Sequence, residues 1–249
     1  MTTDGRPDPG SVLVLIPAYC EEACIEQVVL DVRDAGFACL VIDDGSTDRT
    51  AAIATAAGAP VLRLPINLGV GGALRAGFRY AVAHGYGCVV QVDADGQHVA
   101  DHIPELLAAL DDGPLPIDMV IGSRFAADAT HAMSRVRRWC IHLLSWVIAR
   151  SGKATVSDPT SGFRAIRSPL LEAFADDFPH HYLGDTFEAI LVAARRGYRI
   201  REIPVIMRAR QGGRPSADLS ALVQAMLRAC TILLTGTSFD LPIRDARRA

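Results

Sequence analysis

The amino-acid sequence predicts an α/β fold in which a mostly parallel central sheet is flanked by helices. Short apolar runs alternate with longer stretches of helical periodicity along the first half of the chain. The apolar runs are continuous Val, Ile and Leu, as in Val12–Ile16, which is typical of strands covered on both faces. A chain of 249 residues that is 50% hydrophobic is long enough to bury the core of such a sheet.

The predicted elements alternate in the way that a parallel sheet requires. Strands are predicted at Val12–Ile16, Cys39–Ile42, Val61–Leu64, Gly87–Val92 and Met119–Ile121. Helices are predicted at Glu21–Ala35, Thr47–Ala57, Gly71–His84 and Ile103–Leu110. Residues 134–152 have the pattern of an amphipathic helix, with Arg135, Arg138, His142 and Ser145 on one face. A loop at 154–166, a helix around Gly184–Arg196, a strand at Arg199–Ile206, a loop at 207–216 and a last helix complete the prediction.

We predict one domain, because no internal repeat, low-complexity region or linker interrupts the chain. Residues 1–11 are polar and rich in Pro and Gly, which predicts a flexible tail without a signal peptide. No apolar run reaches the roughly 18–20 residues that span a bilayer, so we expect a soluble or peripheral protein.

Charge and cysteine usage narrow the class of protein further. A net charge of −3 and a pI near 6.1 argue against a general nucleic-acid binder, which needs a basic surface. The six cysteines are scattered and form no C-x-x-C pair, as expected for reduced thiols in a cytosolic protein.

Polar or glycine-rich clusters follow all five predicted strands of the first half. They lie at residues 17–22, 43–46, 67–72, 93–97 and 122–124. The carboxyl ends of parallel strands meet at one edge of a sheet, and ligands of such sheets bind there. The sequence therefore predicts one crevice that gathers these clusters.

Two acidic pairs stand out at this edge. Asp43 and Asp44 can accept hydrogen bonds from a nucleobase and ribose, although Ser46 or Thr47 with Asp48 can equally form an ordinary helix cap.

The second acidic cluster, Asp93, Asp95 and Gln97, offers hard oxygen ligands for Mg²⁺ or Mn²⁺, with water and diphosphate oxygens completing the shell. A cation there relieves the repulsion between the carboxylates, whereas the plain alternative is a solvated turn. The neighbouring His98 could join the metal ligands, although a lone histidine is more often a packing residue.

Glycines and arginines supply the remaining candidates. The stretch "NLGVGGALRAGF" (67–78) matches neither the dinucleotide-binding nor the Walker A phosphate motif, but its glycines allow backbone to approach a ligand at a helix N-terminus. Candidate phosphate-binding cations are Arg124, Arg135, Arg137, Arg138, Arg164, Arg208, Arg210 and Arg214. Taken singly, most of these would be solvated surface arginines.

With these residues in place, the chain resembles the family 2 glycosyltransferases with the Rossmann-like GT-A fold, and especially the dolichyl- or polyprenyl-phosphate sugar synthases. The segments that carry the resemblance are "IPAYCEE", "VIDDGSTDRT", "NLGVGGALRAGF", "VVQVDADGQH", "IGSRF", "DPTSGFRAI", "GDTFEA" and "MRARQGGRPS". They occur in the order of the family and cover roughly residues 12–216.

The resemblance implies a role for each segment on the donor side. Residues 12–125 would form the nucleotide-sugar-binding half of the domain. The nucleoside would be held by Pro17, Ala18, Tyr19, Glu21 and Asp44, with help from Asp43, and the nucleotide would be flanked by Gly71 and Gly72. The divalent metal and the sugar diphosphate would be bound by Asp93, Asp95 and Gln97, with Asp95 also counted as catalytic.

On the acceptor side, the resemblance implies that residues 126–235 form the second half of the same domain, with C-terminal helices, followed by a tail at 236–249. The acceptor phosphate would meet Arg124 and one arginine of the 135–138 cluster, such as Arg135 or Arg138, with Ser161 nearby. Arg210 and Arg214 would close over the diphosphate. Asp185 and Glu188 occupy positions where many relatives place an acid that activates an acceptor hydroxyl.

The implied reaction is a metal-dependent, inverting transfer of a hexose or N-acetylhexosamine from a UDP-sugar, favoured over a GDP-sugar, to a polyprenyl phosphate. The alternatives are the same donor chemistry on a soluble or glycan hydroxyl, with Asp185 as base, and a catalytically silent nucleotide-sugar-binding module. A sugar-1-phosphate nucleotidyltransferase is disfavoured, because it would want a glycine-rich or basic phosphate loop where the chain has "IPAYCEE".

Three departures from the family pattern qualify the resemblance. Cys20 stands where the family usually has Asn, and "QGGR" (211–214) lacks the Trp of processive synthases. The C-terminal transmembrane helices of many relatives have no counterpart in this sequence. We therefore expect a cytoplasmic protein, peripheral at the inner face of the plasma membrane. Its contact would be made by the Trp139/Trp146 helix, by the last helix or by a small membrane protein partner.

Overall fold

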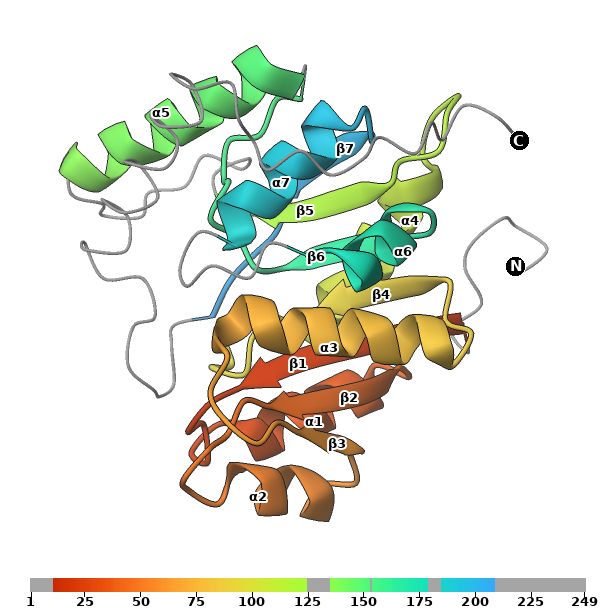
Figure 1. Ribbon diagram of the computed structural model, residues 1–249, viewed down its shortest axis with the longest axis vertical. Helices are drawn as coiled ribbons and strands as arrows, with labels where there is room; N and C mark the ends of the chain where they lie inside the picture. The colour runs from red at the N-terminus through yellow and green to blue at the C-terminus, as the bar shows by residue number, and fades with distance from the viewer. Residues whose placement is uncertain (1–10, 125–134, 153, 179–184, 209–249) are drawn as a thin grey trace.

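A seven-stranded sheet forms the centre of the computed structural model, which describes residues 11–124, 135–152, 154–178 and 185–208 (Figure 1). The strands are β1 (Val12–Ala18), β2 (Ala38–Asp43), β3 (Val61–Arg63), β4 (Cys88–Gln91), β5 (Met119–Ser123), β6 (Arg164–Arg167) and β7 (Ile200–Pro204). The helices are α1 (Ile25–Asp34), α2 (Thr50–Ala56), α3 (Gly69–Ala83), the 3₁₀ turn η2 (Ala100–His102), α4 (Ile103–Asp111), α5 (Arg135–Gly152), α6 (Leu170–Asp176) and α7 (Asp185–Arg195). None of these helices is long and apolar enough to cross a bilayer.

The sheet is mostly parallel, as predicted, with strand order β3-β2-β1-β4-β6-β5-β7. Only β6 runs antiparallel, and it is inserted between β4 and β5. The carboxyl ends of the other six strands therefore share one edge with the beginning of β6. This arrangement brings the segment before β6, residues 157–163, to the edge where ligands of parallel sheets bind.

Several boundaries differ from the sequence prediction. The predicted loop at 154–166 contains the start of β6, and α6 was not predicted. A strand of four residues is too short to show a periodic pattern, and the Pro, Ser and Gly residues before it indicate a loop. The first three helices begin at Ile25, Thr50 and Gly69 rather than at the predicted positions, and the last predicted helix lies outside the described residues.

The two faces of the sheet are covered by different helices, because successive strand side chains point to opposite sides. In β1, Val12, Val14 and Ile16 pack with α1, α2 and α4 on one face. Leu13 and Leu15 pack on the other face with α3, α5, α6 and α7. Figure 1 shows α3 crossing the near side of the sheet over β1. The continuous apolar strands are thus explained by burial on both sides.

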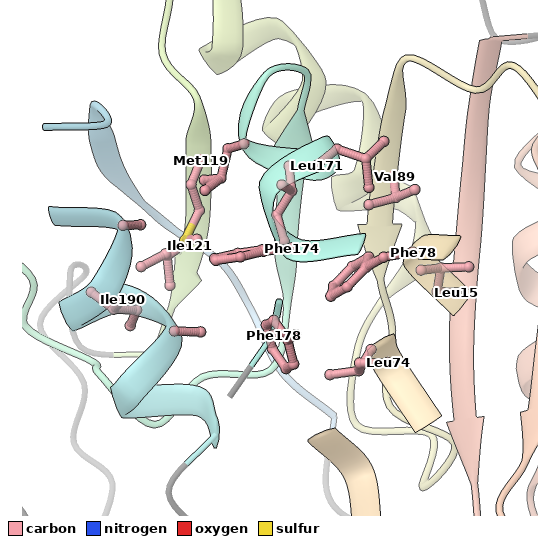
Figure 2. Packing of buried hydrophobic residues seen from close by; sticks show 14 of the residues in the cluster. Leu15, Leu74, Phe78, Val89, Met119, Ile121, Leu171, Phe174, Phe178 and Ile190 are labelled. Carbon is pink, nitrogen blue, oxygen red and sulfur yellow. The ribbon is translucent and has the colours of Figure 1, made fainter. Parts of the chain in front are cut away.

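Three phenylalanines join α3 to α6 within the second of these layers (Figure 2). The ring of Phe78 lies 5.9 Å from that of Phe174 and 5.1 Å from that of Phe178, and the last two rings are 5.0 Å apart. Such tilted and edge-to-face contacts add to the stabilisation that burial provides. The cluster fixes α6, and with it the chain that follows β6.

Replacing Phe174 by alanine should therefore lower the free energy of unfolding by about 3–5 kcal/mol, because a cavity opens between two helices. Urea denaturation followed by circular dichroism measures this change. Leu115→Ala is the matched control, since 54% of Leu115 is exposed and its loss should change stability by less than about 0.5 kcal/mol. Equal effects of the two substitutions would contradict the packing described above.

Candidate active site

The loop after β1 is hydrogen-bonded to the loop after β2. The amide of Cys20 donates to Ser46 Oγ over 2.9 Å, and the amide of Glu21 donates to Thr50 Oγ1 over 2.9 Å. Pro17 and Ala18 are the last residues of β1, and Tyr19 beyond them is 49% exposed. The first predicted nucleoside-binding segment therefore lies beside the second.

Cys20 has a left-handed backbone conformation, with φ of 55°. Among residues other than glycine, Asn and Asp tolerate this conformation best. Cys20, which stands where Asn is usual, therefore adopts this backbone conformation at a higher cost than Asn would.

Asp43 and Asp44 are both buried at the end of β2, but they have different partners. Asp43 accepts the Ser46 amide on Oδ1 over 3.0 Å and pairs with Arg63 Nε through Oδ2 over 3.2 Å. Asp44 accepts the Leu68 amide over 2.7 Å. Burial raises the pKa of the Asp44 carboxyl, and the backbone amides of Leu68 and Gly69 only partly offset this effect.

The alternative interpretation, that residues 43–48 only form an N-terminal cap on the next helix with Ser46 or Thr47 as the N-cap, is wrong. Helix α2 begins at Thr50 behind an Arg49 that makes no side-chain cap, so neither Ser46 nor Thr47 is its N-cap. Asp48 instead accepts the Thr50 amide over 2.9 Å. Asp43 and Asp44 therefore have no part in starting the helix, and an open hollow of about 390 Å³ lies beside them, lined by Gly45, Ser46, Arg63, Leu64 and Pro65.

Gly71 and Gly72 lie in the first turn of α3, which begins two residues before the predicted start at Gly71. A Cβ on Gly72 would come within 2.5 Å of Leu68 Cβ, so the glycine lets residue 68 fold back toward Asp44. The unpaired amides of a helix N-terminus favour an anion. The geometry thus places the start of α3 next to the acidic end of β2.

Residues 93–98 form what we call the carboxylate loop, directly after β4. The Asp93 side chain is 39% exposed, whereas Asp95 is buried and accepts the Gln97 amide on Oδ1 over 3.0 Å. His98 Nδ1 accepts the Asp93 amide over 2.9 Å, and the His98 ring stacks on Phe163 at 4.9 Å. His98 is thus a packing residue that fixes the backbone of Asp93, in agreement with the sequence interpretation.

Gly162 lies against Asp93. A Cβ at this position would stand 2.7 and 2.8 Å from the two carboxylate oxygens of Asp93. The missing side chain therefore keeps space in front of that carboxylate.

Arg124 and Asp158 form a buried ion pair between the end of β5 and the segment before β6. Arg124 donates from Nε and Nη2 to the two oxygens of Asp158 over 2.7 and 2.8 Å, and from Nη2 to Thr160 Oγ1 over 2.8 Å. Hydrogen bonds and charge attraction from Arg124 outweigh burial and hold the pKa of Asp158 below its ordinary value. The pKa of Arg124 is raised correspondingly by Asp158 and, more weakly, by Asp93.

The peptide that carries Asp158 is itself held by Glu202 of β7. The two Glu202 oxygens accept the amides of Ser157 and Asp158, each over 2.8 Å. Arg124, expected at the acceptor phosphate, is therefore largely engaged within the protein, and it lies near Asp93.

Two other polar residues predicted near phosphate are buried. Ser161 donates to the Gly122 carbonyl over 2.6 Å and accepts the Phe163 amide over 3.3 Å. Arg164 lies within β6 and donates from Nε to the Ser161 carbonyl over 2.8 Å. Arg164 is thus a core residue, because β6 passes through the middle of the sheet.

The remaining predicted residues lie on the second half of the chain. Arg138 is exposed on α5, and Glu188 is half-buried on α7. Arg135 and Asp185 are the first residues of α5 and α7, and their side chains are outside the described part of the structure. Arg210 and Arg214 also lie outside it. Arg208, however, donates its amide to the Gln97 carbonyl over 2.9 Å, so the chain leaves β7 beside the carboxylate loop.

Comparisons with known proteins identify the family of the chain. The chain is a glycosyltransferase. It belongs to Glycosyl transferase family 2, whose pattern matches residues 13–174, and the resemblance seen in the sequence is thereby confirmed.

Curated relatives include the polyprenol monophosphomannose synthase of Mycolicibacterium smegmatis, which is 32% identical over 89% of this chain and 88% of that protein. The undecaprenyl-phosphate mannosyltransferase of Micrococcus luteus is 33% identical over 81% of this chain and 85% of its own. Among solved structures, glucosyl-3-phosphoglycerate synthase from Mycobacterium tuberculosis in complex with phosphoglyceric acid has a TM-score of 0.68 at 24% identity, covering 92% of this chain and 80% of that one. At this identity the similarity concerns the fold, which is GT-A-like as expected.

Sequence reasoning did not single out Asp158, Gly162 or Glu202. Asp158 and Gly162 stand in "DPTSGF", where an Asp-Pro pair and a glycine indicate only a turn. Glu202 follows Arg201 in the short strand "IREIP", where two adjacent charged residues indicate only a solvent-exposed position. Their importance follows from the insertion of β6, which local patterns do not reveal.

Replacing Asp158 by asparagine should reduce the stability at pH 7 by about 3 kcal/mol, because Arg124 keeps its charge in a mostly buried place. Since the folded pKa of Asp158 is lowered, its contribution is complete above its unfolded pKa near 4 and is lost as the pH falls through the lower folded value. Denaturation between pH 3 and 7 should therefore show that the difference in the free energy of unfolding between wild type and Asp158→Asn becomes smaller below about pH 4.

Asp112→Asn is the control for this experiment, because Asp112 forms a largely exposed pair with Arg201 and should matter by less than about 1 kcal/mol. A gap between wild type and Asp158→Asn that is as wide at pH 3 as at pH 7 would rule out the linkage.

Proposed function

We propose that this family 2 glycosyltransferase moves a hexose or N-acetylhexosamine from a UDP- or GDP-sugar, with UDP favoured, to a polyprenyl phosphate. The transfer is a single in-line displacement that inverts the anomeric carbon. The observation that carries the proposal is that Asp44, Asp93 and Asp95 follow β2 and β4, the two strands that flank β1, and so share one sheet edge, with Arg124 close enough to Asp93 to feel its charge. The names of the two curated relatives support a polyprenyl phosphate as acceptor.

On the donor side, Asp44 is the residue that we assign to the nucleoside. Burial raises the pKa of its carboxyl despite two backbone amides, and N–H or hydroxyl groups of a nucleoside would further stabilise the ionised form. Pro17, Ala18, Tyr19 and Glu21 border the same loop. Asp43 supports it through Ser46, and Gly71 and Gly72 shape the helix start that faces the phosphates.

The carboxylate loop suits a divalent cation such as Mg²⁺ or Mn²⁺. Among the described residues, no three His, Cys, Asp or Glu side chains are grouped as metal ligands. Mg²⁺ is commonly held by only one or two carboxylates together with substrate phosphates, which Asp93 and Asp95 with Gln97 provide for. The space that Gly162 leaves in front of Asp93 is consistent with such a ligand. A bound cation would neutralise the charge of the departing nucleoside diphosphate.

The protein's own cations act on the two phosphate groups of the reaction. A phosphomonoester has a second pKa near ~6, so a polyprenyl phosphate is largely dianionic at pH 7 and needs positioning rather than a general base. Arg138 or Arg135 on α5 would position it, while Arg124 stabilises the crevice between Asp158 and Asp93. Arg210 and Arg214 would stabilise the leaving diphosphate. Arg208, which precedes them in the chain, donates its amide to the Gln97 carbonyl in the carboxylate loop, and this contact supports the assignment.

Helix α5 is the surface that we assign to the membrane. Its eighteen residues include four arginines and no Asp or Glu, although the whole chain has a net charge of −3. Trp139 and Trp146 are 61% and 54% exposed on it. An exposed face with tryptophan and arginine suits the headgroup region of an anionic bilayer, which would place the enzyme at the inner face of the plasma membrane.

The test is release of nucleoside diphosphate from UDP- and GDP-sugars with polyprenyl phosphate, with and without Mn²⁺ or Mg²⁺. We expect release to need both acceptor and metal, and Asp95→Ala to abolish it. Asp185→Asn should retain turnover, because a phosphate acceptor requires no base. Transfer only to a sugar hydroxyl, with loss of activity in Asp185→Asn, would replace the proposal. Donor binding without release under any acceptor would indicate a silent binding module.

Gly162→Ala should weaken the apparent affinity for Mn²⁺ by roughly tenfold while the fold stays intact, because the new Cβ displaces the short, half-exposed Asp93 side chain. Titration of donor turnover with Mn²⁺, together with thermal melting, measures both effects. Gly87→Ala is the matched control, since nothing lies within 4 Å of a Cβ there. An unchanged Mn²⁺ titration for Gly162→Ala would remove Asp93 from the metal site.

A further inference from the structure

Residues 205–208, which we call the β7 extension, cross the sheet edge next to the carboxylate loop. Met207 forms an antiparallel bridge with His98, and the Arg208 amide donates to the Gln97 carbonyl over 2.9 Å. His98 in turn accepts the amide of Asp93. The extension is therefore the neighbour that supports the backbone from which Asp93 and Gln97 project.

Burial contributes little to holding the extension in place. Val205 is buried, but Ile206 is 75% exposed and Arg208 is exposed as well. Besides these backbone contacts, the extension has polar contacts to two residues outside the crevice. His102 Nε2, at the start of α4, accepts the Ile206 amide over 3.2 Å, and Asp31 of α1 pairs with Arg208 Nη1 over 2.7 Å.

Both outer contacts are well oriented. His102 Nδ1 lies 2.8 Å from Glu105 Oε2, so with Nδ1 carrying the proton, Nε2 is free to accept the Ile206 amide. The Asp31 side chain also accepts Gln27 Nε2 over 2.6 Å, which holds the carboxylate toward Arg208. Arg208, a candidate phosphate-binding cation from the sequence, is thus directed at α1.

We propose that Asp31 and His102 are positioning residues for sugar transfer, because they hold the β7 extension against the carboxylate loop. The proposal rests on the proposed function for its kinetic readout only. Neither residue is among those assigned above to the donor or the metal. Their loss should loosen the extension and so raise the donor KM, while kcat changes less.

The expected size of the change in KM and in hydrogen exchange follows from the exposure of the ion pair between Asp31 and Arg208. The side chains of Arg208 and Asp31 are 44% and 24% exposed, and pairs of this kind change an equilibrium by about two- to fivefold. Asp31→Asn should therefore raise the donor KM two- to fivefold and speed amide hydrogen exchange in residues 205–208 by a similar factor. The charge swap Asp31→Arg with Arg208→Asp should restore both quantities, and Asp34→Asn on the same helix should change neither.

His102 is tested by a pair of substitutions. His102→Leu removes the acceptor for the Ile206 amide, whereas His102→Gln can keep one near the position of Nε2. We expect His102→Leu to act like Asp31→Asn and His102→Gln to restore wild-type exchange and KM.

The two readouts separate the failure of this proposal from the failure of the proposed function. Hydrogen exchange needs no substrate, so it decides whether Asp31 and His102 hold the extension even if no acceptor supports turnover. In that case donor affinity is measured calorimetrically with UDP or GDP and Mn²⁺. Unchanged exchange in Asp31→Asn and His102→Leu, or a charge swap that restores nothing, would overturn the proposal.

Discussion

The arrangement of β5, β6 and β7 at the ligand-binding edge of the sheet depends on the ion pair between Arg124 and Asp158. It joins the end of β5 to the segment before β6, and Glu202 binds the same segment from β7. A buried pair of charges is stable only when its geometry compensates for lost hydration. Here two contacts from Arg124, one from Thr160 and a backbone amide surround the Asp158 carboxylate. Three strand ends are thereby held in one arrangement.

The two sides of the crevice are built by different means. On the side of β2, carboxylates accept backbone amides from the next loop along the chain, as Asp44 does from Leu68. On the other side, segments distant in sequence meet through β6, so that Gly162 lies against Asp93. The part of the sheet from β1 to β4 is thus a regular parallel α/β unit, whereas the part beyond β4 depends on the antiparallel strand β6.

Much of the first half was predictable because its signals are local. Continuous Val and Ile runs such as Val12–Ile16 indicate buried parallel strands, and the rule that ligands bind at their carboxyl ends is enough to place the acidic clusters at one edge. The antiparallel β6 was missed because four residues carry no period. The burial of Arg164 and Ser161, and the contact of Arg208 with Asp31 across 177 positions, depend on tertiary neighbours that no local pattern contains.

Both tryptophans of the chain lie on α5, and both are more than half exposed. The other aromatic side chains are tyrosines and phenylalanines, which emit weakly beside indole. Intrinsic fluorescence of the unlabelled protein therefore comes almost wholly from one helix. Its wavelength and quenching report what approaches α5, with no dye or engineered reporter.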